Sequence, residues 1–246
     1  MIKFVLIAIA VILLTIGLVW IIDKFVPTKL KPILNILLWV LIAFLGYQTF
    51  MSVYNPILFN KVKEKRYAKV IEKLIDIRDA QLAYKEVKGT YTNSFDSLTK
   101  FIENDKFAII ERRDTSVIDV EKTRRYNGIE YRKEIVLIDT LSFVSVKDSL
   151  FKTSDRYKTL RTVPFAKEGT NFTMNAGKIG EEGDVKLAVF EAFVLKKDIL
   201  HDQDKDYVLE ENQTMSVDGV NGDAIRVGSM EEVKVNGNWP KLYDTK

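Results

Sequence analysis

The chain has 246 residues, with 37 Lys and Arg against 34 Asp and Glu, one histidine and no cysteine. The lack of cysteine excludes disulfides, thiolate catalysis and cysteine-ligated metals. The net charge of +3 comes from residues 1–60, so residues 61–246 hold 33 basic and 33 acidic side chains. Nucleic-acid binding needs a clustered basic surplus, so we expect no nucleic-acid partner.

Two long stretches near the N-terminus contain no charged residue: Phe4–Ile22, with 19 residues, and Pro32–Asn60, with 29. A helix needs roughly 20 apolar residues to cross the hydrocarbon core of a membrane, and a charge near the bilayer centre is costly. We therefore predict a transmembrane hairpin over residues 1–60, with spans at about 4–22 and 33–54 in contact with membrane lipid. The first stretch lacks a small-x-small cleavage site, so we interpret it as an uncleaved anchor and not as a signal peptide.

The basic residues near the spans favour one orientation. In a two-span hairpin the N-terminus and residues 61–246 lie on the same side, where six Lys and Arg side chains lie close to the membrane. The connecting loop holds three lysines. The positive-inside rule therefore favours a multi-pass protein of the bacterial inner membrane with a cytoplasmic head. Because the loop is itself basic, a periplasmic head stays open as the alternative.

After the second stretch, the pattern predicts one long amphipathic helix over Lys61–Val87, because apolar residues recur near a 3.6-residue period. Pro56 interrupts the preceding apolar run and predicts a bend. Gly89 predicts the C-terminal end of the helix, and Asn93 or Ser94 is expected to cap a shorter helix that follows. The apolar face of that shorter helix holds Phe95, Leu98, Phe101 and Ile102.

From about Phe107 the sequence changes to short runs typical of strands, separated by turn residues. The predicted strands are Phe107–Ile110, Glu134–Asp139, Leu141–Val146, Asn171–Met174, Val185–Leu195 and Ala224–Val227. Residues 111–133 are rich in charge and are expected to form an excursion or a helix. The predicted fold class is α+β, with the long amphipathic helix packed on a mainly antiparallel β-sheet head. The expected parts are the transmembrane hairpin 1–60, a helical stalk and corner 61–104, and a β-rich head 105–246.

An apolar helix, a proline, an amphipathic continuation, a Gly-x-Tyr corner and a short leucine-bearing helix follow one another over residues 33–102. The matching residues are Pro56-Ile57-Leu58, Val70–Lys85, Gly89-Thr90-Tyr91 and Ser97-Leu98. In this order the chain resembles type IV pilins, above all the major pseudopilins of type II secretion systems. The resemblance implies a helix that scaffolds a fibre and a corner that turns the chain back onto a small sheet.

The sequence departs from that family at the start of the second stretch. Lys29-Leu30-Lys31-Pro32 stands in place of the family's processing site, and the uncharged run holds no counterpart of the glutamate used in assembly. A processed fibre subunit is therefore not expected. The whole chain, including Val227–Glu232 and Gly237–Pro240, also resembles a family of bacterial envelope proteins with one or two spans before a pilin-like helix. That resemblance implies no particular activity.

One short acidic segment offers candidate metal ligands. Asp202, Asp204 and Asp206 stand at alternate positions, as do the first oxygen ligands of a calcium loop. Tyr207 stands where such a loop needs glycine, and Lys205 adds a positive charge among the ligands. A solvated acidic turn is therefore the favoured interpretation, and calcium at these three aspartates is the alternative. No other cofactor is expected.

The sequence lacks catalytic patterns. With one histidine and no cysteine, a triad would need His201 beside a distant serine, and no Gly-x-Ser-x-Gly elbow exists. We therefore expect a non-enzymatic, membrane-anchored scaffold or assembly protein of a bacterial envelope machine, secretion- or pilus-like. Its expected partners are membrane lipid and other membrane or envelope proteins, further copies of itself included. The alternative function is a membrane-anchored ligand- or calcium-sensing domain.

Overall fold

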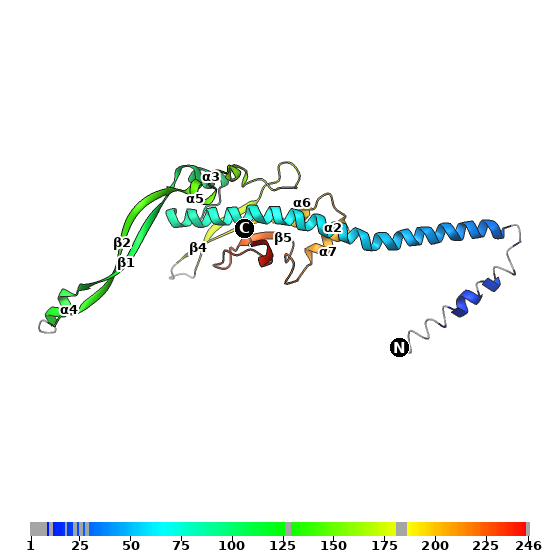
Figure 1. Ribbon diagram of the computed structural model, residues 1–246, viewed down its shortest axis with the longest axis horizontal. Helices are drawn as coiled ribbons and strands as arrows, with labels where there is room; N and C mark the ends of the chain where they lie inside the picture. Colours follow the sequence, from blue (N-terminus) through cyan, green and yellow to red (C-terminus); the bar gives the residue numbers. More distant parts are fainter. Residues whose placement is uncertain are drawn as a thin grey trace. The chain divides into compact units, whose positions relative to one another are not determined.

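In the computed structural model of the protein (Figure 1), residues 9, 12–17, 19–21, 24, 27, 30–125, 129–180 and 186–244 are described. The chain divides into two compact units, Met1–Leu58 and Phe59–Lys246. The residues of one helix, α2 (Lys31–Lys88), belong to both. The chemistry of the two units differs sharply, so each is considered by itself.

The first unit is dominated by apolar helix. From Lys31 to Leu58 the side chains of α2 are almost all exposed, and most of them are apolar. A helix that is hydrophobic all round is suited to an apolar surrounding and not to water. Within the described part of the chain, α2 is the one helix long and apolar enough to cross a membrane, judged by length and composition. It lies near the N-terminus and is compatible with a membrane anchor.

The predicted first span, residues 4–22, lies in part outside the described residues, which here are 9, 12–17 and 19–21. Those described within 12–21 are helical, and this apolar segment is shorter than a membrane span. The two-span hairpin therefore stays a prediction. Pro56, which was expected to bend the chain, lies inside α2 and does not end it.

In the second unit, α2 is buried at the positions that the periodicity of its apolar residues predicts, and the four consecutive residues 74–77 are buried, so the helix is enclosed there on more than one face. The buried apolar side chains of α2 in this unit are Phe59, Tyr67, Val70, Ile71, Leu74, Ile75, Ile77, Ala80 and Ala83. Gly89 follows the helix with φ +77°, and its N–H donates to the carbonyl of Lys85 at 2.8 Å. Only glycine adopts this conformation without strain, which confirms the predicted end of the helix.

The next helix also agrees with the sequence. Ser94 is the N-cap of α3 (Phe95–Asn104), and its hydroxyl accepts a hydrogen bond from the N–H of Ser97. The apolar face of α3 is buried through Leu98, Phe101 and Ile102. The corner between α2 and α3 therefore depends on local residues that can be recognised in the sequence, the glycine at 89 and the serine cap at 94.

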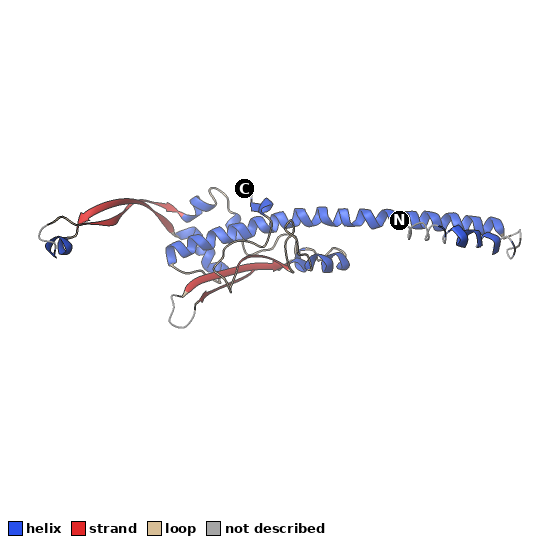
Figure 2. Cartoon of the chain, turned by 90° about the horizontal axis from the view of Figure 1, so that it is seen from below, coloured by secondary structure: helices blue, strands red, loops and turns tan. Residues whose placement is uncertain are grey.

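The chain then forms a long two-stranded hairpin. β1 (Lys106–Ile118) pairs antiparallel with β2 (Arg132–Ser145), and α4 (Val120–Arg125) lies between them (Figure 2). The register shifts once, between Ile109 and Ile110. The neighbouring helices α3 and α5 (Val146–Leu150) contact the strand β2 of the hairpin.

Residues 111–118 continue the strand β1 and are not helical, so residues 111–133 belong to an excursion that takes the form of a long hairpin. Both faces of the hairpin are largely exposed, so charged residues occupy either face and the alternation of a half-buried strand is lost. The helix expected within 111–133 is reduced to the single short α4.

A three-stranded antiparallel sheet lies alongside the second part of α2 in Figures 1 and 2. β4 (Leu187–Leu195) is the central strand, between β3 (Thr173–Ile179) and β5 (Ala224–Gly228). β4 and β5 fall where the sequence predicts them. β3 begins two residues later than predicted and continues to Ile179.

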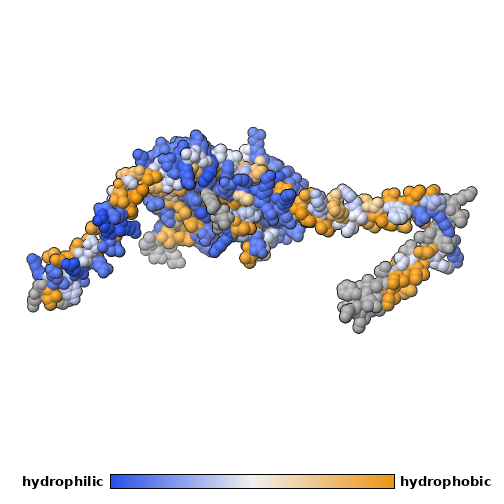
Figure 3. Space-filling view, viewed as in Figure 1, coloured by the Kyte–Doolittle hydropathy of each residue, from blue (hydrophilic) through white to orange (hydrophobic). Residues whose placement is uncertain are grey.

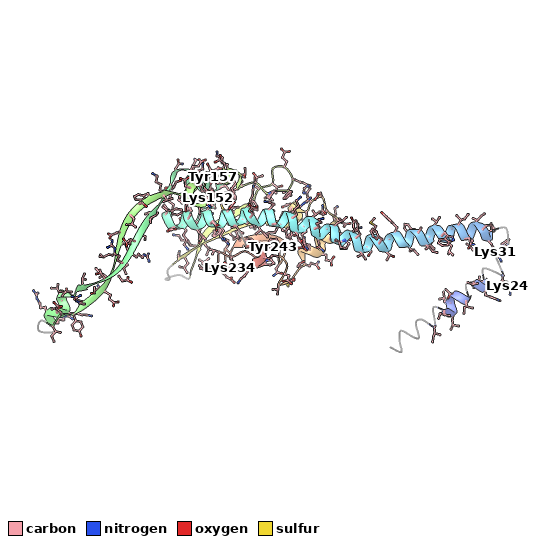
Figure 4. The ribbon with its side chains drawn as sticks, in the orientation of Figure 1. Lys24, Lys31, Lys152, Tyr157, Lys234 and Tyr243 are labelled. Atoms are coloured by element: carbon pink, nitrogen blue, oxygen red, sulfur yellow. The ribbon has the colours of Figure 1, made fainter. Side chains whose placement is uncertain are left out.

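Short helical turns complete the unit. They are η1 (Arg156–Thr159), α6 (Lys196–Ile199), α7 (Lys205–Asn212) and η2 (Lys241–Asp244). Tyr243 of η2 packs against the core beside the residues of α2 (Figure 4), and burial raises the pKa of its hydroxyl. Helix α2, the sheet and these turns share one hydrophobic core, which confirms the α+β class.

Polar side chains of α2 fix it to separate loops. The buried carboxylate of Asp76 accepts from Arg156, with Oδ2 2.8 Å from Nε and Oδ1 3.1 Å from Nη2. Gln81 donates to the carbonyl of Thr92 at 2.5 Å and accepts from the N–H of the same residue at 3.1 Å. Because each anchor lies on a different turn of the helix, α2 organises the whole second unit.

Replacing Leu74 by alanine is expected to lower the free energy of unfolding by about 3 kcal/mol, because the side chain is fully buried and leaves a cavity. Leu82→Ala, on the same helix, is the matched control: Leu82 is 37% exposed and should cost about 1 kcal/mol or less. Denaturant unfolding of the full chain in detergent, followed by circular dichroism, measures both. Equal losses would contradict the assignment of α2 to the core.

Candidate functional site

The three aspartates proposed as calcium ligands have separate structural roles. Asp202 forms a bidentate ion pair with Arg66, with Nη1–Oδ1 and Nη2–Oδ2 distances of 2.5 and 2.7 Å. Asp204 is the N-cap of α7 and accepts from the N–H of Asp206 at 2.9 Å. Among the described residues, no group of three His, Cys, Asp or Glu side chains could hold a metal ion. Calcium binding at these positions stays a prediction.

Arg66 joins α2 to the α6–α7 region. Besides Asp202, its guanidinium donates to the carbonyl of Ile199 at 2.7 Å. The hydrogen bonds from Arg66 lower the pKa of Asp202, so this carboxylate stays ionised well into the acid range. A calcium ion would have to compete with this guanidinium for both carboxylate oxygens.

Lys196 and Glu211 form a buried ion pair between α6 and α7. Lys196, at the start of α6, is completely buried, and Glu211 of α7 is 7% exposed. The Lys196 ammonium lies 2.7 Å from the carbonyl of Glu211, 2.8 Å from that of Val220 and 3.1 Å from Oε1 of Glu211. These three acceptors use all three N–H donors of the ammonium, which is the condition under which a buried charge is tolerated.

Two residues of α2 complete this buried cluster. Lys63 Nζ lies 2.8 Å from Oε2 of Glu211, and the Tyr67 hydroxyl donates to Oε1 at 3.4 Å. Burial lowers the pKa of Lys196, and Glu211 acts in the opposite direction. Burial and the neighbouring Glu211 carboxylate together raise the pKa of Tyr67. The cluster therefore connects α2, α6 and α7. The three N–H donors of Lys196 already have acceptors within it.

A surface groove of about 450 Å³ lies between α6, α7 and the loop at residues 167–170. Its apolar lining includes Leu200, Val208 and Leu209, and its polar lining includes Lys167, Lys197, Lys205, Asp198, His201 and Asn212. The three lysine side chains form no ion pair with a described residue. Oδ1 of Asn212 is buried and has no hydrogen-bond partner among the described residues. The groove therefore offers an apolar floor with a mainly cationic rim.

The β1–β2 hairpin is the second exposed feature. Val136, Ile138 and Phe143 of β2 are 55%, 56% and 66% exposed, although each is a large apolar side chain. Figure 3 shows hydrophobic residues on the visible face of the hairpin next to the body of the unit, with hydrophilic residues between them and those farther out. Contiguous exposed apolar residues mark interaction sites in soluble parts of proteins.

Sequence reasoning did not find the Lys196–Glu211 pair, the groove or the full length of the hairpin. The two ion-pair residues are 15 positions apart and look like ordinary surface charges in the sequence. The one local signal for the hairpin is the uncharged run at 135–138, which was identified as a strand but not as an exposed one.

Comparisons of the chain with protein-family models, with curated proteins and with solved structures found no match. The function therefore has to be inferred from the residues and their geometry.

Replacing Glu211 by glutamine is expected to lower the free energy of unfolding by about 3 kcal/mol, because it leaves the buried Lys196 charge without a counter-ion. Glu210→Gln is the matched control, since Glu210 is exposed on the same helix and should change stability little. Thermal unfolding of both variants of the full chain in detergent measures the difference. Indistinguishable melting temperatures would show that the cluster does not hold α2 to α7.

Proposed function

We propose that the protein is a non-enzymatic, membrane-anchored scaffold that assembles other proteins at a bacterial envelope. The observation that carries this proposal is the long hairpin, whose apolar side chains stay exposed although the rest of the unit has a well-packed core. An exposed apolar ribbon serves binding better than it serves the stability of the fold. The apolar part of α2 supplies the membrane anchor.

The proposed location is the bacterial inner membrane, with the second unit on the cytoplasmic side. Six basic residues flank the proposed spans on the side of the second unit and three lie in the loop, which supports this orientation under the positive-inside rule. A periplasmic second unit is the alternative. It would fit better with the resemblance to pseudopilins, and the machine would then be secretion- or pilus-like.

The arrangement of ionisable groups supports a non-enzymatic role. The ammonium of Lys196 is held by three acceptors, and the carboxylate of Glu211 is shared by three donors. The single histidine, His201, is exposed and its Nδ1 lies 3.2 Å from the carbonyl of Asp198. A general acid or base needs an accessible proton beside a bound substrate. These groups instead serve the contact between α2, α6 and α7.

Polar substitutions in the hairpin are expected to release protein partners without unfolding the protein. We expect the chain, solubilised with mild detergent from its native membranes, to sediment in assemblies that contain other proteins. Val136→Ser with Ile138→Ser should remove those proteins and leave the melting temperature unchanged, because both side chains lie outside the core.

The matched control is Met215→Ser with Val217→Ser, since these apolar residues are 93% and 92% exposed in a loop of the same unit. The control should retain the assemblies. A hairpin variant that keeps its partners, or a control that loses them equally, would contradict the proposed role of the hairpin.

The groove favours a second candidate function, a membrane-anchored ligand-sensing domain. Three lysines around an apolar floor suit an anionic amphiphile better than they suit a cation. Calcium bound by Asp202, Asp204 and Asp206 is the other form of this candidate.

On this alternative, octanoate is expected to raise the melting temperature of the full chain in zwitterionic nanodiscs, because a ligand that binds only the folded state stabilises it. Lys197→Gln with Lys205→Gln should remove the effect, whereas the charge-matched control Lys100→Gln with Lys106→Gln should keep it. Stabilisation by calcium chloride that is lost in Asp202→Asn would support the calcium form. A melting temperature unchanged by either probe would contradict the ligand-sensing function.

A further inference from the structure

The hairpin has two open edges. In the described structure β1 and β2 pair only with each other, so each strand has a side on which its backbone N–H and C=O groups lack a strand partner. The strands have 13 and 14 residues, longer than most strands in globular proteins. An isolated two-stranded ribbon is only marginally stable in water, so a further strand at one edge would stabilise it.

The two edges differ in charge. The centre of β1 is Glu111-Arg112-Arg113-Asp114, a run of four charged residues. The first half of β2 holds the uncharged run Ile135-Val136-Leu137-Ile138, with charged residues before it at 132–134 and after it at Asp139. Charged side chains on an edge strand discourage pairing with another chain. The edge of β2 is therefore the one left open to a further strand.

We propose that the edge of β2 pairs with the same edge of a second copy of this chain, antiparallel and centred on Val136. The result is a four-stranded sheet with the strand order β1-β2-β2-β1 across the two copies. This inference deepens the proposed scaffold function, on which it rests, by naming one of the partners of the hairpin.

Two-fold symmetry restricts the possible registers. In an antiparallel pair, adjacent residue pairs alternate between hydrogen-bonded and non-hydrogen-bonded types. A two-fold axis can exchange only residue pairs of the same type. Neighbouring pairs differ in type, so the axis cannot lie between them. It must therefore pass through a pair in which one residue lies opposite the same residue of the other copy. Within the uncharged run only four centres are available, Ile135, Val136, Leu137 and Ile138.

Charge complementarity selects one of these centres. With Val136 opposite itself, Lys133 of each copy lies opposite Asp139 of the other, Ile135 lies opposite Leu137, and Glu134 lies opposite Ile138. Cross-strand pairs of opposite charge are stabilising, and this register forms two of them. Centring on Leu137 places Asp139 opposite Ile135, and centring on Ile135 places Lys133 opposite Leu137. Centring on Ile138 places Lys133 opposite Phe143.

The two charges are available for this contact. Lys133 forms no ion pair with a described residue. Asp139 has one distant cross-strand contact, 3.7 Å from Arg113, and both of these side chains are more than 60% exposed. An exposed pair at that distance contributes little to stability, so Asp139 gives up little by turning to a second copy.

A charge exchange tests the register. In purified full chain reconstituted in detergent, we expect a dimer by analytical ultracentrifugation. Lys133→Asp should weaken it about tenfold or more, because both cross-strand pairs become repulsive. Adding Asp139→Lys to that variant should restore the dimer. A wild-type monomer, or a double variant that stays monomeric while its melting temperature is unchanged, would overturn the proposal.

Cysteine cross-linking tests the centre independently, because the chain has no cysteine of its own. Two Val136 side chains should lie about 5 Å apart, so Val136→Cys should be joined by a short bismaleimide into a dimer of the 28.3 kDa chain. Val117→Cys, on β1 with 43% exposure, is the control, since its copies should be roughly 14 Å apart or more. Equal cross-linking of the two variants would overturn the proposed edge.

The two proposals fail in different ways. If the purified chain is monomeric but native assemblies still lose other proteins when the hairpin is changed, self-pairing is wrong and the scaffold function stands. If the purified chain forms the predicted dimer but no other protein accompanies it in native membranes, self-pairing stands and the wider scaffold function is wrong.

Discussion

The burial of α2 in the core is the interaction on which the second unit depends. The small sheet and the short helices contribute their buried apolar residues to the same core as α2. They meet on the part of α2 that runs from Tyr67 to Ala83. Burial of apolar area is the dominant favourable term in folding, so the loss of this part of α2 would remove the common surface to which the other elements attach. Polar contacts then set where each element attaches.

Those polar contacts are placed so that no buried charge is left alone. Arg66 holds α6, Asp76 holds η1, and Gln81 holds the corner before α3. Lys196 and Glu211 lie deeper and neutralise each other. A buried ion pair adds little net stability compared with apolar packing, but loss of one partner is costly. These contacts therefore specify one arrangement of α6 and α7 on α2 more than they add to the total stability.

The hairpin differs from the rest of the second unit, because most of its apolar side chains are not buried. Its apolar side chains contribute little to the core, and its length extends the ribbon well beyond what the contact with α3 and α5 requires. A run of four charged residues occupies the centre of β1, whereas β2 holds the uncharged run 135–138. Together with an apolar helical segment suited to a membrane, this distribution supports a protein that holds a binding surface at a membrane.

The sequence predicted the features that depend on local signals. The helical period of Tyr67 to Ala83, the glycine at 89 and the serine cap at 94 each act within a few residues, and each is confirmed. Contacts between distant residues have no such signal: nothing in the sequence marks Lys196 as buried, because its partner is defined by the fold. The strand at residues 111–118 was not predicted, because an exposed strand tolerates charged residues on both faces and so lacks an alternating pattern. The alternating aspartates at 202–206 resembled metal ligands, although Asp202 pairs with an arginine 136 positions earlier.

Hydrogen–deuterium exchange of the full chain in detergent, at a concentration low enough to keep it monomeric, tests the central claim most directly. If α2 is the common core and the hairpin is held for partners, amides of residues 67–83 should exchange slowest, through global unfolding. Amides of residues 106–118 and 132–145 should exchange faster, through local opening. Hairpin amides as well protected as those of α2, or fast exchange within residues 67–83, would contradict this account.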